Sequence, residues 1–365
     1  MTLRVLHTEA SLGWGGQEIR ILSEARGLAR LGHEVLLAAP AQARIASEAA
    51  RFGVEAIALP IGRKGLGGMA ALRRLLGARA FDVVNTHSST DTWLAAMACA
   101  TLGRRAPPIV RTRHISAPLP RNAATRWLYR SATRRIVTTG ERLRAQVIAQ
   151  AGVDPARVVS IPTGIALDRF QPGDAAAARR EVGLPAGVPV VGIVATLRSW
   201  KGHRYLLEAI AGMARRDVHL AIVGDGPQRA ALELRAVELD LGSRVTFAGN
   251  RDDVAPWMRA FDLFCLPSYA NEGVPQALMQ AMACGLAVVS TPVGSIDEIV
   301  ADGDTGVMVA PADAAALRAA ITRLLDDAPA RRALGERAAA RARERFGESL
   351  MVERMLAVFE AARLG

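Results

Sequence analysis

The chain has 365 residues, half of them hydrophobic and only 4% aromatic, which suggests two globular domains and excludes a disordered or fibrous protein. Its three cysteines lie far apart in apolar stretches, which argues against a disulfide framework or a zinc site and favours a reducing compartment. No apolar run approaches the roughly 18 residues that a membrane span needs, and the first residues lack the length of a signal peptide. We therefore expect a soluble, cytoplasmic protein.

The net charge of +11 is unevenly distributed along the chain. Residues 1–170 hold 24 Lys and Arg against 11 Asp and Glu, whereas the remainder holds 22 against 24. A basic first half can serve phosphorylated substrates, an anionic membrane surface or nucleic acid. Because only Lys64 and Lys201 are lysines, an Arg-rich genome explains the charge equally well. Zinc-finger spacing, an RNP-like aromatic strand and basic-zipper heptads are all missing from the sequence, so we expect no nucleic-acid partner.

Short β-branched apolar runs alternate with Ala- and Leu-rich helical segments, which predicts an α/β protein with parallel sheets covered by helices on both faces. In the first half the expected strands are 3–8, 34–39, 54–58, 82–86, 108–112, 134–138 and 157–161. Residues 162–189 are rich in Pro and Gly, which indicates a linker with a short helix at about 174–182.

Alternation then resumes, and the chain ends in helical segments. The later strands are expected at 190–195, 218–223, 244–248, 262–266 and 287–290, and the final helices at 313–326, 330–345 and 348–363. This order predicts two doubly wound, Rossmann-like domains in tandem. Ligands of such sheets bind at the carboxyl ends of the strands.

The first glycine loop, residues 13–18, reads Gly-Trp-Gly-Gly-Gln-Glu between the first strand and the first helix. Glycines let the backbone approach a ligand, and the helix N-terminus offers N–H groups to a phosphate, so Gly15 and Gly16 are candidates for donor binding. A dinucleotide fingerprint needs glycine where Glu18 stands, which disfavours NAD. A tight turn packed for its own sake is the alternative.

A second cluster places Arg198 and Lys201 between a strand and a helix, where two cations three residues apart can hold a diphosphate. It is followed by another glycine-rich strand end that contains Gly224 and Gly226. The pair is a weak signal alone, because Arg and Lys are ordinary loop residues.

A third cluster, residues 267–291, provides the strongest signal. Glu272 and Gly273 precede a helix that we expect to begin near Pro275, a residue favoured in a first turn. Gln280 is polar among the apolar residues of that helix, and a contact with ligand hydroxyls would explain it. The N-terminus of the helix also offers backbone donors to a phosphate.

Taken in order, these clusters resemble the retaining GT-B glycosyltransferases of family 4, and the resemblance covers nearly the whole chain. The matching stretches are Gly15-Gly16-Gln17-Glu18, Ile161-Pro162-Thr163-Gly164-Ile165 with Arg169-Phe170, Arg198 with Lys201, Glu272-Gly273-Val274-Pro275, and Ala281-Met282-Ala283-Cys284-Gly285. Such an ordered series is far more specific than any one motif.

The resemblance implies roles for individual residues. The catalytic set it implies is Glu272, His114, Arg198 and Lys201, in which His114 faces the donor sugar, Glu272 positions that sugar and the two cations neutralise the departing diphosphate. The donor-binding set is Gly15, Gly16, Gly224, Gly226, Gly273, Val274 and Gln280. His87 and Glu18 are expected at the acceptor, and the other histidines are expected to be structural.

Two positions depart from the family's pattern. Gln280 stands where the second acid of an E-x7-E motif holds the nucleotide ribose, and Thr163 replaces the usual Asn. A carboxylate accepts two hydroxyl hydrogen bonds, whereas an amide accepts one and donates one. The loss of a charged acceptor weakens binding by about 1–3 kcal/mol if nothing compensates.

No metal or other cofactor is expected. The acid pairs Asp252-Asp253 and Asp326-Asp327 are best explained as helix caps, and Arg, Lys and helix dipoles can stabilise a departing diphosphate without a metal. Two basic amphipathic segments, 63–79 and 121–135, are typical of helices that lie on an anionic membrane, here the inner face of the cell membrane. They are equally typical of solvated helices in an Arg-rich protein.

The sequence thus predicts a GT-B protein in which residues 1–165 bind the acceptor, 166–347 bind the nucleotide-sugar and the last helix, within 348–365, crosses back to the first domain. The expected reaction moves a sugar from a UDP- or GDP-type donor to a glycan or lipid-linked acceptor in bacterial surface polysaccharide or lipopolysaccharide synthesis. Two alternatives are a sugar-nucleotide epimerase of similar fold and a catalytically weak partner subunit, which Gln280 favours.

Overall fold

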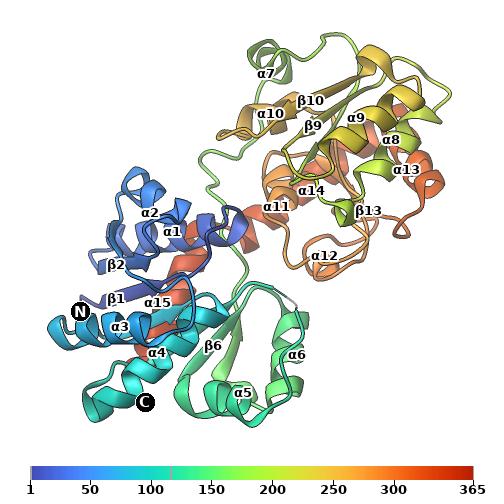
Figure 1. Ribbon diagram of the computed structural model, residues 1–365. Coiled ribbons are helices and arrows are strands. Elements are labelled where there is room, and N and C mark those ends of the chain that lie inside the picture. The colour runs from blue at the N-terminus through green and yellow to red at the C-terminus, as the bar shows by residue number, and fades with distance from the viewer. Residues whose placement is uncertain (1, 116, 365) are drawn as a thin grey trace. The chain divides into compact units, whose positions relative to one another are not determined.

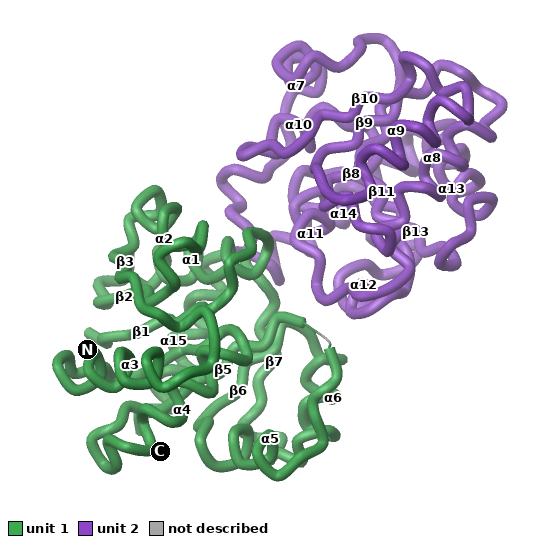
Figure 2. The backbone as a smooth tube through the Cα atoms, in the orientation of Figure 1, with its two compact units in different colours: residues 1–164, 348–365 green, residues 165–347 purple. Residues whose placement is uncertain are grey.

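The computed structural model describes residues 2–115 and 117–364. The chain forms two compact units, unit 1 with residues 1–164 and 348–365 and unit 2 with residues 165–347 (Figure 2). The boundary lies one residue before the predicted one.

Unit 1 is built on a parallel sheet whose strand order is β3-β2-β1-β4-β5-β6-β7. The strands are β1 (Arg4–Thr8), β2 (Glu34–Ala39), β3 (Glu55–Ala58), β4 (Val83–Thr86), β5 (Ile109–Arg113), β6 (Arg135–Thr138) and β7 (Val158–Ser160). The helices are α1 (Gly16–Arg30), α2 (Arg44–Glu48), α3 (Leu66–Ala78), α4 (Ser89–Leu102), α5 (Ala123–Trp127), α6 (Glu141–Ala151) and α15 (Glu348–Leu364). Each predicted strand lies within two residues of its expected bounds.

Successive strand residues of unit 1 pack into different layers, because side chains alternate between the two faces of a sheet. Val83 packs in a cluster with Met355 and Phe359 of α15. Its neighbour Val84 packs with Leu72 of α3 and Leu94 of α4. Helices therefore cover both faces of this sheet (Figure 1), as the βαβ pattern predicts.

Unit 2 repeats the arrangement with the strand order β10-β9-β8-β11-β12-β13, again parallel throughout. Its strands are β8 (Val190–Val194), β9 (His219–Val223), β10 (Val245–Gly249), β11 (Leu263–Leu266), β12 (Ala287–Ser290) and β13 (Val307–Met308). Its helices are α7 (Ala175–Val182), α8 (His203–Ala211), α9 (Arg229–Glu238), α10 (Ala255–Ala260), α11 (Gln276–Ala283), α12 (Ile296–Ile299), α13 (Ala314–Asp326) and α14 (Ala328–Arg345). The two-residue strand β13 was not predicted, because it is too short to show a pattern.

The predicted linker at 162–189 is mostly part of unit 2 instead. Helix α7 packs against α10, and Arg179 forms an ion pair with Asp262 at 2.5 Å. Arg179 also donates to the backbone carbonyls of Ala260 and Val188. These tertiary contacts hold the Pro- and Gly-rich segment on unit 2.

The C-terminal helix α15 belongs to unit 1, as predicted. It packs along α1, where Arg26 holds both carboxylate oxygens of Glu348 at 2.9 Å. Gly27 lies against Val352 so closely that an added Cβ would be 2.3 Å from a methyl group of that valine. The fit between these helices therefore depends on a residue without a side chain. None of the helices within the described residues is long and apolar enough to cross a membrane.

We predict that Gly27→Ala lowers the thermal midpoint, because the new methyl group overlaps Val352 and overpacking of this kind costs about 1–3 kcal/mol. The matched control is Gly77→Ala in α3, where no atom lies within 4 Å of the added Cβ. Alanine favours helices over glycine by about 1 kcal/mol, so the control should be neutral or stabilising. Equal midpoints for the two variants in a thermal denaturation series would contradict the packing of α15 on α1.

Candidate functional site

In unit 2, the loops that follow the adjacent strands β8 and β11 meet at the carboxyl edge of the sheet. Lys201, in the short 3-10 helix Ser199–Lys201, lies 2.6 Å from the Glu272 carboxylate. Glu272 is only 4% exposed, and the Ser268 hydroxyl donates to the same carboxylate oxygen at 2.5 Å. The structure thus brings together two of the four predicted catalytic residues, 71 positions apart.

The backbones of these two loops hold one another in place. The Tyr269 N–H donates to the Trp200 carbonyl at 2.8 Å. Gly202 has φ of +77°, and an added Cβ would be 2.0 Å from the carbonyl oxygen of Pro267. Only glycine adopts this conformation without strain and leaves room for the neighbouring backbone. Lys201 is therefore fixed by its loop as well as by its ion pair.

Arg198 is exposed at the same edge and stacks over the Trp200 ring at 5.8 Å. It borders a cavity of about 120 Å³ that is also lined by Ser199, Tyr205 and Tyr269. Among the described residues, no carboxylate is paired with Arg198. Its charge is available to an anion, and a guanidinium can bind phosphate oxygens through two N–H groups.

Backbone packing by itself explains why glycine stands at positions 224 and 226. Their φ angles are +136° and +159°, and a Cβ on Gly224 would be 2.1 Å from the Ala195 carbonyl oxygen. Leu197 donates from its N–H to the Asp225 carbonyl at 3.0 Å, so this turn supports the loop that carries Arg198. A direct contact of either glycine with the donor remains a prediction.

Helix α11 begins one residue after the expected start, with Pro275 at its N-cap. Gly273 accepts from the Ser295 N–H at 3.2 Å, which fixes the residues just before the helix. Val274 and Gln280 are half-buried, and Gln280 lies on α11 amid apolar residues, as predicted. The structure offers the Gln280 side chain no hydrogen bond to another described residue, which leaves the amide for a ligand.

In unit 1, a residue that the sequence analysis did not single out organises the glycine loop. The Glu9 carboxylate, directly after β1, accepts from the Ser11 N–H at 2.7 Å and from the Gln17 side chain. Glu18 is buried nearby and lies 3.9 Å from the positions of Cβ atoms added at Gly13 and Gly15. The only sequence signal for Glu9 was its position at the end of a strand.

Acidic side chains therefore surround the loop that was expected to approach a phosphate. Burial, reinforced by the negative charge of Asp91, raises the pKa of Glu9 to about 8. A protonated Glu9 can donate a hydrogen bond as well as accept one, so it suits the hydroxyl groups of a ligand. Donor binding by Gly15 and Gly16 and acceptor binding by Glu18 both stay predictions.

Three histidines line up at the carboxyl edge of unit 1, where β1, β4 and β5 are neighbours. His7 and His87 approach within 3.0 Å through Nδ1 and Nε2, and His87 Nδ1 lies 3.1 Å from His114 Nε2. Both ring nitrogens of His87 thus face other histidines. The contact of His87 with an acceptor stays a prediction, and His7, expected to be structural, lies in the same row of rings.

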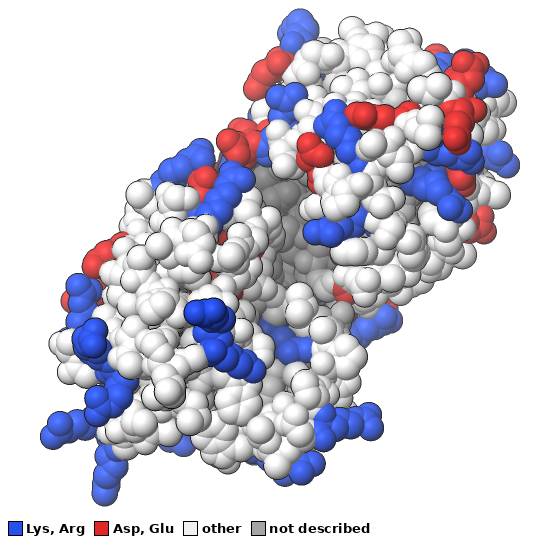
Figure 3. All heavy atoms as spheres, viewed as in Figure 1, with Lys and Arg blue, Asp and Glu red and all other residues white. Residues whose placement is uncertain are grey.

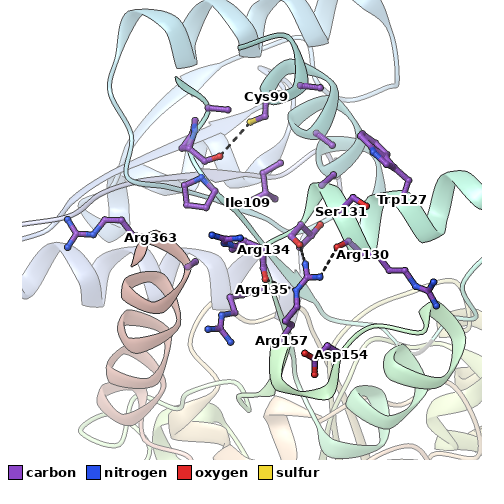
Figure 4. A pocket seen from close by; sticks show the side chains of 18 of the residues that line it. Cys99, Ile109, Trp127, Arg130, Ser131, Arg134, Arg135, Asp154, Arg157 and Arg363 are labelled. Atoms are coloured by element: carbon purple, nitrogen blue, oxygen red, sulfur yellow. Dashed lines mark hydrogen bonds between the residues drawn. The ribbon is translucent and has the colours of Figure 1, made fainter. Parts of the chain in front are cut away.

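A groove of about 820 Å³ lies at the opposite edge of the unit 1 sheet, where β5 and β6 begin. Arg157 donates there to the backbone carbonyls of Arg130 and Arg134, and Arg135 donates to the carbonyl of Ala156. Figure 4 shows the guanidinium groups of Arg130 and Arg363 pointing away from each other. The guanidinium groups of Arg135 and Arg157 therefore bind the backbone.

No group of three or more His, Cys, Asp or Glu side chains with the geometry of a metal site occurs in residues 2–115 and 117–364. The expectation of a metal-independent protein is not tested by this finding and stays a proposal.

The comparisons with known proteins agree with the two units. The family described as Glycosyltransferase Family 4 matches residues 14–169, and the family described as Glycosyl transferases group 1 matches residues 188–327. The chain belongs to the group 1 glycosyltransferases of family 4. A D-inositol 3-phosphate glycosyltransferase of Nocardia farcinica (strain IFM 10152) is 33% identical over 289 residues. That match covers 72% of this chain but only 62% of the relative's length.

Solved structures show the same fold. A glycosyltransferase from Rickettsia africae ESF-5 superposes with a TM-score of 0.89 at 19% identity, covering 99% of this chain and 98% of its own. HepE from Anabaena, solved with UDP and glucose, has a TM-score of 0.85 at 20% identity, covering 98% and 100%. The fold is therefore GT-B, as the sequence predicts.

We predict that stability falls as pH rises towards 8, and that Glu9→Gln removes part of this fall. A carboxyl group with a raised pKa keeps in the folded state a proton that it loses on unfolding between its ordinary value of 4.5 and about 8. One such proton changes the free energy of unfolding by up to about 1.4 kcal/mol per pH unit in that range.

Urea unfolding of both proteins at pH 5 to 8 measures this slope. The control is Glu336→Gln on an exposed part of α14, which should keep the wild-type slope. If Glu9→Gln has the same slope as the control, Glu9 is ionised in the folded protein and the assignment is wrong.

Proposed function

We propose that the protein is a retaining glycosyltransferase that moves a sugar from a UDP- or GDP-type donor to an acceptor hydroxyl. The observation that carries this proposal is the group of Arg198, Lys201 and Glu272 at adjacent strand ends of unit 2. Two cations and a buried carboxylate in one place suit a ligand that combines a diphosphate with sugar hydroxyls.

Each of the three side chains has a chemical task. Arg198 and Lys201 neutralise the diphosphate as it leaves, which lowers the barrier by stabilising charge that develops in the transition state. Glu272 accepts hydrogen bonds from hydroxyls of the donor sugar and so orients its anomeric carbon. The departing phosphate oxygen takes the proton of the acceptor hydroxyl, so the step needs no metal and no covalent glycosyl-enzyme.

The acceptor divides the proposal into two cases. The family resemblance of the sequence points to a glycan or lipid-linked acceptor in surface polysaccharide or lipopolysaccharide synthesis. Relatives such as the Nocardia protein are instead named D-inositol 3-phosphate glycosyltransferases. The raised pKa of Glu9 keeps its carboxyl group protonated beside the glycine loop of unit 1, where it can both donate to and accept from the hydroxyls of a polyol. We therefore keep the glycan acceptor as the first candidate and the inositol phosphate as the second.

Binding to an anionic membrane surface is a further part of the proposal. Leu66 is 79% exposed at the start of α3, close in sequence to Arg63 and Lys64. The helical part of the second basic segment, 121–135, runs only from Ala123 to Ala132. Figure 3 shows Lys and Arg in several places on the visible face of unit 1. We take the start of α3, where Leu66 is exposed, as the candidate for the contact.

We predict that Arg198→Ala and Lys201→Ala each lower turnover at least tenfold, because each loses a charge-assisted contact worth about 1.5–3 kcal/mol. The measurement is a panel of UDP- and GDP-sugars with glycan, lipid-linked and inositol phosphate acceptors, in the presence of EDTA. Arg180→Ala, an exposed arginine on α7, is the matched control and should keep wild-type turnover.

The same panel separates the alternatives. An epimerase converts the donor without transferring its sugar, and a non-catalytic partner subunit binds without any turnover. Wild-type rates from both variants would remove the diphosphate assignment, and activity that EDTA abolishes and Mg²⁺ restores would remove metal independence.

We predict that Gln280→Glu changes nucleotide affinity by about 1 kcal/mol or more, roughly fivefold. The two side chains are nearly isosteric, so the fold should be kept, while a carboxylate can accept both ribose hydroxyls. Calorimetric titration with UDP and GDP measures the change, and Gln171→Glu, exposed in the same unit, is the control. An unchanged affinity would show that Gln280 does not contact the ribose.

A further inference from the structure

Three adjacent strands of unit 1 each present one histidine at the same edge of the sheet. His7 lies on β1, His87 follows β4 and His114 follows β5, and consecutive ring nitrogens are 3.0 and 3.1 Å apart. His7 is fully buried, His87 is 4% exposed and His114 is partly exposed. The row therefore runs from the interior of the domain to its surface at the candidate site.

The backbone around the row is fixed by Asp91, the third residue of α4. Its carboxylate accepts from the His87 N–H at 2.9 Å and from the Thr8 hydroxyl at 2.7 Å. These bonds join the ends of β1 and β4 to one helix, which keeps His7 and His87 at hydrogen-bonding distance.

The inner end of the row faces a buried carboxylate. His7 Nε2 lies 4.0 Å from Glu24 Oε1. The same oxygen accepts from the Asn85 amide at 3.0 Å, and the other carboxylate oxygen is 3.8 Å from Arg20 Nε. Asn85 is itself held by the Thr112 hydroxyl at 3.0 Å, which fixes its amide as the donor to Glu24.

All three imidazoles are neutral near physiological pH. Burial lowers the pKa of His7 to about 3, and burial together with neighbouring positive charge holds the pKa values of His87 and His114 well below 6.5. A neutral imidazole has one N–H donor and one acceptor nitrogen. In a row of such rings only two arrangements satisfy every contact: all rings donate from Nε2, or all donate from Nδ1.

The carboxylate decides between these two arrangements. Glu24 Oε1 is 4.0 Å from His7 Nε2, which is beyond hydrogen-bonding distance, but the negative charge of an ionised Glu24 still favours an N–H dipole pointing towards it. A proton on His7 Nε2 makes His7 Nδ1 the acceptor for His87 and His87 Nδ1 the acceptor for His114. We propose that Glu24, His7 and His87 form a positioning relay that fixes His114 as its Nε2–H tautomer, with His114 Nδ1 left as a hydrogen-bond acceptor. His114 then accepts a hydrogen bond from a ligand hydroxyl and does not donate one.

The nature of that ligand rests on the proposed function, in which a sugar hydroxyl is the donor to His114 Nδ1. The relay itself does not depend on the proposed function, since its residues all lie within unit 1 and its hydrogen bonds involve no ligand. A test that observes the imidazole protons directly therefore separates the two.

Protein labelled with ¹⁵N only at histidine contains six imidazoles, so its long-range ¹H–¹⁵N spectrum can be assigned by single substitutions. We measure it at pH 8, because burial raises the pKa of Glu24 to about 7 and the carboxylate is then mostly ionised. The groups that face Glu24 are Arg20 from α1, His7 from β1 and Asn85 from β4. The expected result is a protonated Nε2 and an unprotonated Nδ1 in His7, His87 and His114.

The informative variant is His7→Phe, whose ring has a similar shape but no nitrogen. His87 then loses the acceptor for its Nε2–H, and a buried unpaired N–H is costly, so His87 and His114 should both change to Nδ1–H. His219→Phe, in unit 2, removes a histidine bonded to Thr246 and should leave the three unit 1 signals unchanged.

Nδ1–H forms in the wild-type spectrum would overturn the relay, and so would a folded His7→Phe protein in which His114 keeps Nε2–H. If His7→Phe does not fold, the wild-type spectrum decides by itself. A confirmed relay in a protein without transferase activity would leave this inference intact and remove only the proposed function.

Discussion

Parallel strand pairing is the constraint on which both candidate sites depend. In a parallel sheet the loops that follow neighbouring strands all leave at one edge, so residues far apart in the sequence meet there. Lys201 and Glu272 are 71 positions apart and meet because β8 and β11 are neighbours. His7 and His87 are 80 positions apart and meet because β1 pairs with β4. Each pair is then brought together by the strand pairing and the short loops that follow the strands.

Buried charge in unit 1 fixes positions and is not by itself a source of stability. Arg20 is fully buried, donates to the Ile161 carbonyl at 2.7 Å and lies 3.8 Å from Glu24. Removing two charges from water costs more than their attraction usually returns, unless further hydrogen bonds satisfy them. Asn85 and the Ile161 carbonyl supply such bonds, which ties α1 to β4 and to the residue after β7.

The candidate sites of the two units contain different ionisable groups. Around the glycine loop of unit 1, Glu9, Glu18 and Asp91 are buried close together, whereas unit 2 exposes Arg198 beside the Lys201–Glu272 pair. This difference is consistent with the proposed binding of the diphosphate in unit 2. The sequence has its excess of positive charge in the first half of the chain, but most arginines of unit 1 lie on its surface and not at its candidate site.

The sequence by itself determined the strands, the two α/β units and the return of the last helix to unit 1, because hydrophobic periodicity and local motifs are visible without a structure. The sequence could not show that residues 165–189 pack in unit 2. A Pro- and Gly-rich segment has no hydrophobic periodicity, so a flexible linker and a segment packed on a domain look alike. The sequence also could not predict the role of Glu9 or the relay through His7. Their roles come from burial and from pairing across strands, which only the tertiary structure decided.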